Sequence, residues 1–417
     1  MKVLIVSYFF PPHGGGGVLR VAETARLLAG RGWDLTVVAG PEDGWWVSDE
    51  SLAGKVPESI NVIRQHAVGL SALFGMLGRG GCRRESGVRG LKSLAAWLPV
   101  TDAYAGWSKA AARTALTAGF HPDWILTTSP PESVHLAGMH LAERLGARWA
   151  ADFRDPWTAA IYRGCPTPLH RRWQAAKEGR VVRHADLVIA TNEPAADDFR
   201  GRYPDQARDK FVCLPNGFDP AEFETLDIRR SFRLPLSLIH AGNLTLDRDI
   251  SALLEAIRRV NRDGLVCRLE LAGQVTDHVG KMVRELDLGA AVTISGYVPR
   301  PGLLAKLAAA HVGLLVEAFR PGAELIVPGK LYDYLGAGLP TLAIVPPGAA
   351  AELVNGERFG LAATEPDPNR LENLLRQLVE NVKRGRPALR PPDPVRAGQF
   401  QRPRIVERLA ELMESHR

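Results

Sequence analysis

The stretch VPGKLYDYLGAGLP, residues 327–340, joins a turn, a cation, a carboxylate and a second turn. Pro328 and Gly329 end an extended run, so a helix can begin near Lys330 with free N–H groups directed at an anion. Asp333 follows one helical turn later, where a carboxylate can accept both hydroxyls of a ribose. The stretch therefore indicates a nucleotide-binding helix of an α/β protein. An ordinary helix between two strands is the alternative interpretation.

The size and composition of the chain indicate a soluble protein of two domains. Its 417 residues exceed the size at which a single hydrophobic core usually stops growing. Hydrophobic residues make up 46% of the chain and charged residues 24%, which is the balance of a globular protein. The apolar opening MKVLIVSYFF lacks a small-residue cleavage site, so we interpret it as a buried first strand rather than a signal peptide. We therefore expect a cytoplasmic location.

The cysteines indicate neither a disulfide framework nor a zinc site. Cys82, Cys165, Cys213 and Cys267 lie far apart in the sequence and form no Cys-x-x-Cys pair. His, Asp and Glu form no cluster with the spacing of metal ligands either. We therefore predict a site that works without a metal.

The net charge of +6 favours anionic partners, but the chain lacks the dense basic stripe of a nucleic-acid-binding protein. Arginine and lysine gather among apolar residues in one segment, from about residue 70 to residue 98. Such a mixture is typical of an amphipathic segment that lies on a membrane surface. Several glycines weaken any continuous helix there, so a solvated loop is the alternative. This segment is our candidate for peripheral contact with the inner face of the plasma membrane.

Apolar strands alternate with amphipathic helices through both halves of the chain, which is typical of helices packed on parallel sheets. Short runs rich in Val and Ile suit strands that are buried on both faces. We therefore predict two doubly wound, Rossmann-like α/β domains. The expected strands are KVLIVSY, DLTVVAG, NVIRQH, DWILTTS, RWAADF and ADLVIATN in the first half, and LSLIHAG, CRLELAG, AVTISGY, VGLLVEA and TLAIV in the second.

The segment LPNGFD, residues 214–219, interrupts this alternation and resembles a hinge. Its proline, asparagine and glycine break the pattern, and a new alternation starts after Pro235. We expect an N-terminal domain over residues 1–216 and a C-terminal domain over residues 217–399. For the final helix, within about residues 400–417, the sequence leaves two alternatives: it packs on the C-terminal domain or back on the N-terminal domain.

A glycine-rich loop, PPHGGGG, follows the first expected strand and opens the first helix. Gly15 and Gly16 can adopt dihedral angles that a Cβ would forbid, and a helix N-terminus favours a phosphate or a developing oxyanion. The loop is not a P-loop, because no Gly-Lys-Ser/Thr ending follows, and it fits the Gly-x-Gly-x-x-Gly fingerprint poorly. A dinucleotide-dependent dehydrogenase is therefore the weaker interpretation.

Polar residues follow the expected N-terminal strands at their carboxyl ends, where ligands of open α/β sheets bind. His13, Ser129, Asp152, Arg154 and Asp155 lie at such positions. The two aspartates can orient a bound hydroxyl or sugar, but Arg154 can equally pair with either of them in a structural ion cluster. His13 can bind a substrate or cap its own loop.

In the second half, HAGNLTLDRD places Asn243 and Arg248 in a loop after a strand. The planar fork of an arginine matches a diphosphate, and an amide adds a further donor. A surface arginine paired with Asp247 or Asp249 is the alternative, and taken alone the loop favours it.

Together these segments resemble the retaining nucleotide-sugar glycosyltransferases of the GT-B fold, in the large family 4. The similarity covers nearly the whole chain: PPHGGGG, LPNGFD at the hinge, then HAGNL, GYVPRPGLLAKLAAAHVGLL and PGKLYDYLGAGLP. TTSPPESVHLAG and ADFRDPWT are similar to a subgroup that includes capsule and surface-polysaccharide transferases. The resemblance implies two domains that face each other across a deep cleft, with the acceptor on the first and the donor nucleotide on the second.

The family pattern implies donor-binding roles for several residues. Asp333 matches the acid, usually a glutamate, that holds the ribose hydroxyls. Arg248 matches the family's second cation, and Asn243 falls where the family normally has an arginine. The groups that match the diphosphate site are the backbone of Gly329, Lys330 and Leu331 and the glycine loop at Gly15 and Gly16.

One departure from the pattern concerns the donor sugar. The family commonly has two glutamates eight positions apart, and the first of these positions is Leu325 here. Glu324 is its neighbour and Glu317 is the other nearby carboxylate, so a one-residue shift in the loop would bring Glu324 to the sugar. The departure is compatible with a different donor or with loss of activity.

The resemblance implies a hexosyltransferase-type enzyme, EC 2.4, that serves cell-surface polysaccharide or glycoconjugate biosynthesis. The nucleotide-diphosphate-sugar is a co-substrate, and we expect no cofactor. Arg248 and Lys330 would stabilise charge on the leaving phosphate, with Asp155 and Glu324 as further catalytic candidates. The candidates for binding a glycan, lipid-linked or small-molecule acceptor are His13, Ser129, Asp152 and Arg154.

Two other functions remain open. A sugar-nucleotide 2-epimerase shares the two-domain architecture and would release an epimerised product without an acceptor. A non-catalytic GT-B protein would bind a nucleotide-sugar through Asp333 without turnover.

Overall fold

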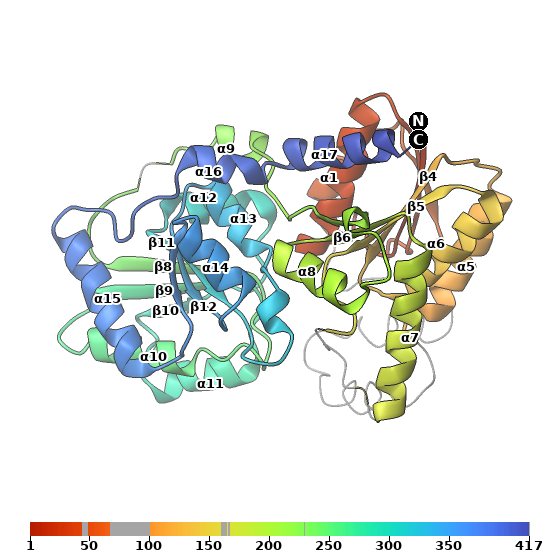
Figure 1. The fold of residues 1–417 in the computed structure, drawn as a ribbon. Helices are drawn as coiled ribbons and strands as arrows, with labels where there is room; N and C mark the ends of the chain where they lie inside the picture. Colours follow the sequence, from red (N-terminus) through yellow and green to blue (C-terminus); the bar gives the residue numbers. More distant parts are fainter. Residues whose placement is uncertain (44–48, 67–100, 160–164, 166, 229, 417) are drawn as a thin grey trace. The chain divides into compact units, whose positions relative to one another are not determined.

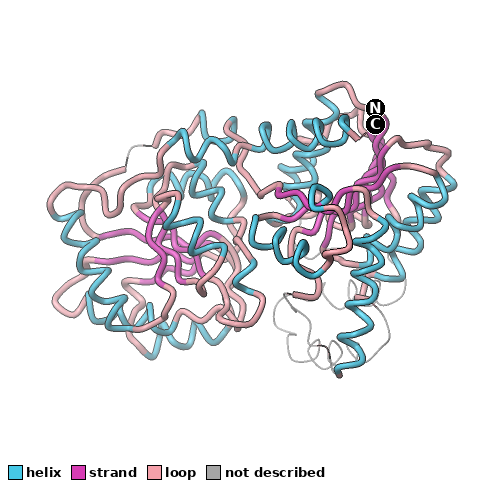
Figure 2. Tube along the Cα trace, in the orientation of Figure 1, coloured by secondary structure: helices cyan, strands magenta, loops and turns pink. Residues whose placement is uncertain are grey.

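The structure, a computed structural model, describes residues 1–43, 49–66, 101–159, 165, 167–228 and 230–416. By its internal contacts the chain divides into two compact units. Unit 1 comprises Met1–Pro215 and Ile405–Arg417, and unit 2 comprises Asn216–Arg404. Each unit is built around one sheet (Figures 1 and 2). The predicted α/β fold class, with two doubly wound domains, is confirmed.

Unit 1 contains a seven-stranded sheet in the order β3-β2-β1-β4-β5-β6-β7, and all its strand pairs are parallel. The strands are β1 Lys2–Ser7, β2 Asp34–Ala39, β3 Asn61–Arg64, β4 Trp124–Ser129, β5 Arg148–Phe153, β6 Leu187–Ala190 and β7 Phe211–Cys213. The apolar central strands β1 and β4 are almost completely buried. Their burial is expected where helices cover both faces of a parallel sheet.

The helices of unit 1 lie on both faces of this sheet (Figure 1). They are α1 Gly16–Gly30, α2 Glu50–Ala53, α5 Ala105–Thr117, α6 Ser133–Leu145, α7 Pro168–His184, α8 Glu193–Arg202 and, at the end of the chain, α17 Arg402–Ser415. Helices α1 and α17 share one apolar cluster with strand residues such as Ile5 and Leu126. His135 of α6 contacts Thr127, which points to the opposite face from Leu126. The last helix therefore packs on unit 1, beside α1 and across the sheet from α6.

Unit 2 contains a six-stranded parallel sheet in the order β10-β9-β8-β11-β12-β13. The strands are β8 Leu236–Ala241, β9 Cys267–Ala272, β10 Val292–Ile294, β11 Val312–Val316, β12 Thr341–Ile344 and β13 Gly360–Ala363. The order reverses between β8 and β11, because the chain leaves β10 and returns to the other side of β8. Ligands of open α/β sheets bind outside the carboxyl ends of the strands at such a reversal.

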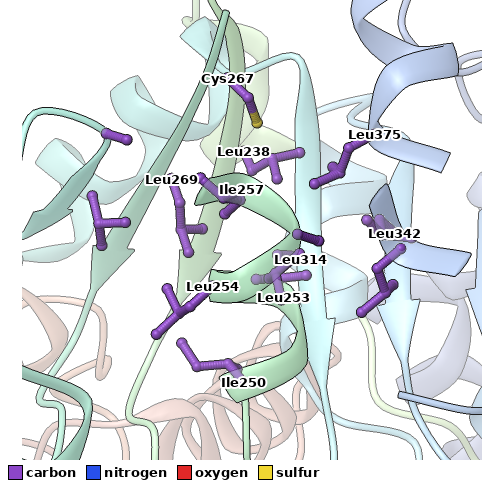
Figure 3. Close-up of a cluster of buried hydrophobic side chains, with 14 of the residues drawn as sticks. Leu238, Ile250, Leu253, Leu254, Ile257, Cys267, Leu269, Leu314, Leu342 and Leu375 are labelled. Carbon is purple, nitrogen blue, oxygen red and sulfur yellow. The ribbon is translucent and has the colours of Figure 1, made fainter. Parts of the chain in front are cut away.

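The helices of unit 2 are α9 Ala221–Glu224, α10 Ser251–Val260, α11 Asp277–Glu285, α12 Arg300–Ala309, α13 Lys330–Gly336, α14 Ala349–Gly356, α15 Pro368–Lys383 and α16 Pro394–Ala397. On one face of the sheet, Ile257 of α10 packs with Leu238 and Leu314 (Figure 3). The strand neighbours Ile239 and Leu315 point to the other face and belong to a second apolar cluster, with α12, α13 and α14. The candidate donor helix α13 is thus fixed on the sheet by burial of its apolar side.

Two edge strands, β7 and β13, were not predicted. β7 has three residues, and β13 reads GLAA, which combines weak strand formers without a β-branched residue. Both lie at an edge of their sheet, where pairing with one neighbour is enough to order a short strand. Pairing with distant residues, rather than local pattern, decides such strands.

The predicted membrane-contact segment, about residues 70–98, lies outside the described residues, as does Cys82. Within the described ranges, no helix combines the length and the apolar character needed to cross a bilayer.

Candidate functional site

The site in unit 2 is built where the chain leaves β8, β9 and β11 and enters α13. Gly242 follows β8 with a φ of 129°, a conformation that favours glycine. A Cβ on Gly242 would lie 2.5 Å from Cε of Lys330, so the lysine stem passes directly over bare backbone. Gly273 follows β9 and makes similar room, because its Cβ would lie 2.3 Å from the carbonyl of Gly242. Gly242 thus lets the first side chain of α13 approach the end of β8, and Gly273 lets the loop after β9 lie against the backbone of Gly242.

A buried ion pair lies at the end of β11. Glu317 is 1% exposed and accepts hydrogen bonds from Arg248, Nη2 to Oε2 at 2.9 Å and Nε to Oε1 at 3.2 Å. The backbone N–H of Ala318 also donates to Oε1, at 2.9 Å. Asp249, which the sequence suggested as a partner for Arg248, accepts from the N–H of Ser251 at 2.8 Å. Arg248 therefore turns toward the sheet, where Glu317 fixes its guanidinium.

Lys330 is the second cation of this site. Burial, with a smaller contribution from Arg248, lowers the pKa of Lys330 to about 8, while Glu317 and Asp333 act to raise it. Its ammonium makes no hydrogen bond or ion pair within the described part of the chain. A partly buried ammonium without a bonded partner would gain most from an anion, which would also raise its pKa. The geometry is therefore suited to a phosphate group.

Asp333 lies one turn along α13 from Lys330. Its Oδ1 accepts a hydrogen bond from Nη2 of Arg300 at 2.8 Å, and its side chain is 18% exposed. Its Oδ2 has no hydrogen bond among the described residues. The carboxylate is therefore anchored by one oxygen and leaves the other able to accept a hydroxyl, as a ribose-binding acid must.

The predicted backbone donors at the start of α13 are not equivalent. The N–H of Leu331 donates to the carbonyl of Pro328 at 3.1 Å, so the structure does not offer it to a ligand. The N–H groups of Gly329 and Lys330 have no acceptor within the described ranges. The turn before α13 thus offers two of the three expected donors.

Two other predicted donor-site residues have local partners. Oδ1 of Asn243 accepts from the N–H of Gln274 at 3.0 Å, which ties the loop after β8 to the loop after β9. Oε2 of Glu324 accepts from the N–H of Gly322 at 2.7 Å, within its own short turn. The structure therefore gives both residues a loop-ordering contact, and their roles at the donor sugar stay predictions.

In unit 1 the glycine loop enters α1 as predicted, with Gly15 at the N-cap and a φ of 110°. Arg154 fixes this loop to β4, because its guanidinium donates to the carbonyls of Gly17 and Ser129, the latter at 2.6 Å. A Cβ on Gly17 would lie 2.4 Å from Nη1 of Arg154. Burial lowers the pKa of Arg154, and Asp155 acts against that shift. Arg154 therefore orders the predicted phosphate loop, a role that the sequence did not indicate.

Asp152, a predicted acceptor ligand, is bonded through both of its oxygens. Arg20 of α1 donates to Oδ1 at 2.8 Å and to Oδ2 at 2.9 Å, and Thr128 donates to Oδ2 at 2.9 Å. Arg20 also donates to the carbonyls of Leu214 and Pro215, at 3.0 and 2.8 Å. Asp152 thus belongs to a network that joins α1, the sheet and the first two residues of the LPNGFD segment.

His13 is completely buried, and its Nε2 lies 2.7 Å from the carbonyl of Pro41. Burial lowers the pKa of His13, so the ring is neutral at pH 7. The structure therefore favours the loop-capping alternative over contact with a substrate. Ser129 is also buried, whereas Asp155 is partly exposed at the end of β5.

Arg300, Glu222 and Arg20 are contacts of the candidate site that sequence reasoning missed. Each lies far along the chain from its partner, so no local spacing links them. Within the described ranges, no group of three His, Cys, Asp or Glu side chains is arranged to hold a metal.

Family models match both units. A glycosyl transferase 4-like domain matches residues 15–217, and a glycosyl transferases group 1 domain matches residues 235–381. A curated relative, the putative colanic acid biosynthesis glycosyltransferase WcaL of Escherichia coli (strain K12), is 23% identical over 201 residues. That match covers 47% of this chain and 48% of WcaL, so it spans about half the length of each protein.

Solved structures share the whole fold. Sucrose-phosphate synthase from Thermosynechococcus elongatus has a TM-score of 0.72 at 17% identity, covering 99% of this chain and 98% of its own. Anabaena HepE in complex with UDP and glucose has a TM-score of 0.65 at 15% identity, covering 100% of both chains. At these identities the similarity shows the fold alone, which is the GT-B fold of these glycosyltransferases.

Proposed function

The chain belongs to the group 1 glycosyltransferases, and we propose that it transfers a hexose from a nucleotide-diphosphate-sugar to an acceptor hydroxyl with retention of configuration, as a family 4 enzyme. The observation that carries the proposal is the pair of groups on α13. Among the residues that the structure describes, the Lys330 ammonium has no bonded partner, and Oδ2 of Asp333 accepts no hydrogen bond. Their separation by one helical turn suits a nucleotide whose phosphate and ribose lie on one side of the helix. HepE, a structural neighbour, was solved with UDP and with UDP-glucose.

In the proposed reaction the bond between the sugar and the diphosphate breaks while the acceptor oxygen attacks the same face of the sugar. Negative charge grows on the leaving phosphate, and it takes up the acceptor proton. Lys330 lies at the end of β8 and the Arg248 guanidinium at the end of β11, near enough for Arg248 to lower the pKa of Lys330, and both would stabilise this charge as fixed donors. Glu317 holds the guanidinium of Arg248 in place, so little reorganisation is needed when charge develops. Two cations would serve here in place of a metal.

The acceptor would bind to unit 1 near the glycine loop and Asp155. Asp155 is partly exposed, whereas Asp152 is buried. Asp155 is therefore the better candidate for orienting an acceptor hydroxyl. The similarity to a putative colanic acid biosynthesis glycosyltransferase supports a role in polysaccharide synthesis, and we propose a cytoplasmic location for the protein.

The first test is binding of UDP, GDP, ADP and TDP, measured by thermal shift and by calorimetry. We expect one base to stabilise the protein, because a ligand that binds the native state raises its apparent stability. Asp333→Ala and Lys330→Met should lose this shift. Lys306→Met is the matched control, because Lys306 lies on α12 of the same unit and pairs with Glu270 of β9. A protein that binds none of the four diphosphates would contradict the proposed function.

The second test follows the sugar. The nucleotide-sugars of the identified base are incubated with and without acceptor hydroxyls, and the anomeric configuration of the product is read by NMR. A transferred sugar with the donor's configuration is the expected result. An epimerised nucleotide-sugar formed without acceptor would indicate the 2-epimerase alternative, and binding without any turnover would indicate a non-catalytic protein.

A further inference from the structure

The Asp333 carboxylate belongs to an ionic cluster that draws one member from each of three helices. Arg300 opens α12, Glu222 lies on α9, and Asp333 lies on α13. Nη2 of Arg300 donates to Oε2 of Glu222 at 2.6 Å and to Oδ1 of Asp333 at 2.8 Å. Nε of Arg300 lies 3.4 Å from Oε1 of Glu222. Glu222 therefore faces the Nε–Nη2 edge of the guanidinium with both of its oxygens, and Nη2 also donates to Asp333.

This cluster is shielded from water. The side chains of Arg300 and Glu222 are 10% and 11% exposed. The two carboxylates keep the pKa of Arg300 above its ordinary value, although burial acts in the opposite direction. Charge-assisted hydrogen bonds are strong where water is excluded, so the direction of the Asp333 carboxylate is set by the position of Arg300.

A second and independent contact joins α9 to α13. The ring of Phe223 lies against Gly336, where a Cβ would be 2.4 Å from Cε2 of the ring. Gly336 is three residues after Asp333, so α9 touches the donor helix on neighbouring turns, once through charge and once through apolar packing. At the far ends of α12 and α13, Arg230 donates to the carbonyls of Ala310 and Ala337. Helix α12 is thus bonded to the middle of α13 through its first residue and is linked to the end of α13 through Arg230.

From this geometry we infer that Arg300 and Glu222 are positioning residues that aim Oδ2 of Asp333 at the ribose of the nucleotide. The inference rests on the proposed function, and it assigns the selectivity for 2′ and 3′ hydroxyls to a three-residue unit rather than to Asp333 alone. Without Arg300, the carboxylate would be free to rotate and would face Glu222 without a shared cation. The affinity for a nucleotide that lacks both hydroxyls would depend little on Arg300.

The test compares each of UDP, GDP and ADP with its 2′,3′-dideoxy counterpart by calorimetry. For the base that binds, we expect the wild type to prefer the ribose form by about tenfold or more, the scale of a hydrogen bond to a charged group. Arg300→Met should reduce this preference to near one while changing the dideoxy affinity less than about twofold. Glu222→Gln keeps a neutral acceptor beside Arg300 and should lose part of the preference. Arg300→Lys can bond one acid at a time and should restore part of it.

Lys306→Met is the matched control, because Lys306 lies on the same helix as Arg300 and bonds Glu270 at 2.5 Å. This variant should keep the full preference. The inference is overturned if Arg300→Met weakens both nucleotides equally, since that result indicates a structural role, or if it leaves the preference unchanged. If Arg300→Met does not fold, an unchanged preference in Glu222→Gln overturns the inference equally well. A wild type that binds a diphosphate without any preference overturns it and leaves the donor site standing, whereas a wild type that binds none contradicts the proposed function itself.

Discussion

Replacing Arg248 with methionine removes the bonded cation of a buried carboxylate, and the cost can be worked from the geometry. Breaking a buried ion pair by removing one partner typically costs about 3–5 kcal/mol. The cost should be smaller here, because the Arg248 side chain is 21% exposed and the N–H of Ala318 still bonds Glu317. We therefore expect unit 2 to lose about 2 kcal/mol of stability.

Hydrogen exchange read by mass spectrometry suits this measurement, because it resolves the two units. In peptides that cover β8 and β11, a loss of about 2 kcal/mol should speed exchange by about thirtyfold. Peptides from β1 and β4 of unit 1 serve as the internal reference. All nine tryptophans lie within the first 173 residues, which belong to unit 1. Tryptophan fluorescence would therefore follow the unfolding of unit 1 and miss a loss of stability in unit 2.

A double-mutant cycle separates the ion pair from simple loss of packing. Glu317→Gln keeps the shape of the side chain and removes its charge. In Arg248→Met/Glu317→Gln no buried carboxylate is left unpaired, so the double variant should be more stable than the sum of the single losses predicts, by at least about 1 kcal/mol. Losses that add to within about 0.5 kcal/mol would refute the reasoning, because uncoupled residues behave in that way.

Three further predictions follow from the same contacts. The pKa of Lys330 is lowered to about 8, so its charge is lost as the pH rises from 7 to 9. Calorimetry should therefore show the affinity for a nucleoside diphosphate falling over this range. The affinity of Lys330→Met should be low and should not change with pH. Gly242→Ala places a Cβ against the Lys330 stem at a positive φ, so it should cost about 1–3 kcal/mol of stability and abolish binding, as measured by thermal shift. Arg20→Met leaves Asp152 buried without its cation, so the fluorescence unfolding midpoint of unit 1 should fall by an amount equivalent to about 3 kcal/mol, and a change below about 1 kcal/mol would contradict the network.

The fold was predictable because both sheets are built from local patterns. Each central strand is an apolar run long enough to stand out, and each is followed by a turn or a helix start that the sequence marks. The edge strand β13 was missed because GLAA carries no strand preference and is ordered by pairing with β12. The local sequence pattern therefore predicts the central strands and the helices that cover them. The edge strands depend on pairing between residues that are distant in the sequence.

The candidate site was predictable to a smaller extent. The sequence placed Lys330 and Asp333 one turn apart, because a helix fixes that spacing. It could not show that Asp152 is engaged by Arg20, since 132 positions separate them. Nor could it show that the N–H of Leu331 is occupied, which depends on how the turn at Pro328 closes. Spacing along one element is a local property, whereas the pairing of acids with arginines depends on how distant elements pack.

The pairing of acids with arginines sets the net charge near each end of α13. The two ends differ in sign, so a charged ligand would bind in one orientation. At the Lys330 end, Glu317 neutralises Arg248, so the lysine leaves one net positive charge. At the Asp333 end, Arg300 is shared by Glu222 and Asp333, so one net negative charge remains. A nucleoside diphosphate carries its negative charge on the phosphates and presents uncharged hydroxyl donors on the ribose. It can satisfy both ends only with the phosphates toward Lys330 and the ribose toward Asp333, because the reverse orientation would bring phosphate against an uncompensated carboxylate. The two arginine clusters would therefore set one orientation of the proposed nucleotide, and they include residues that lie outside α13.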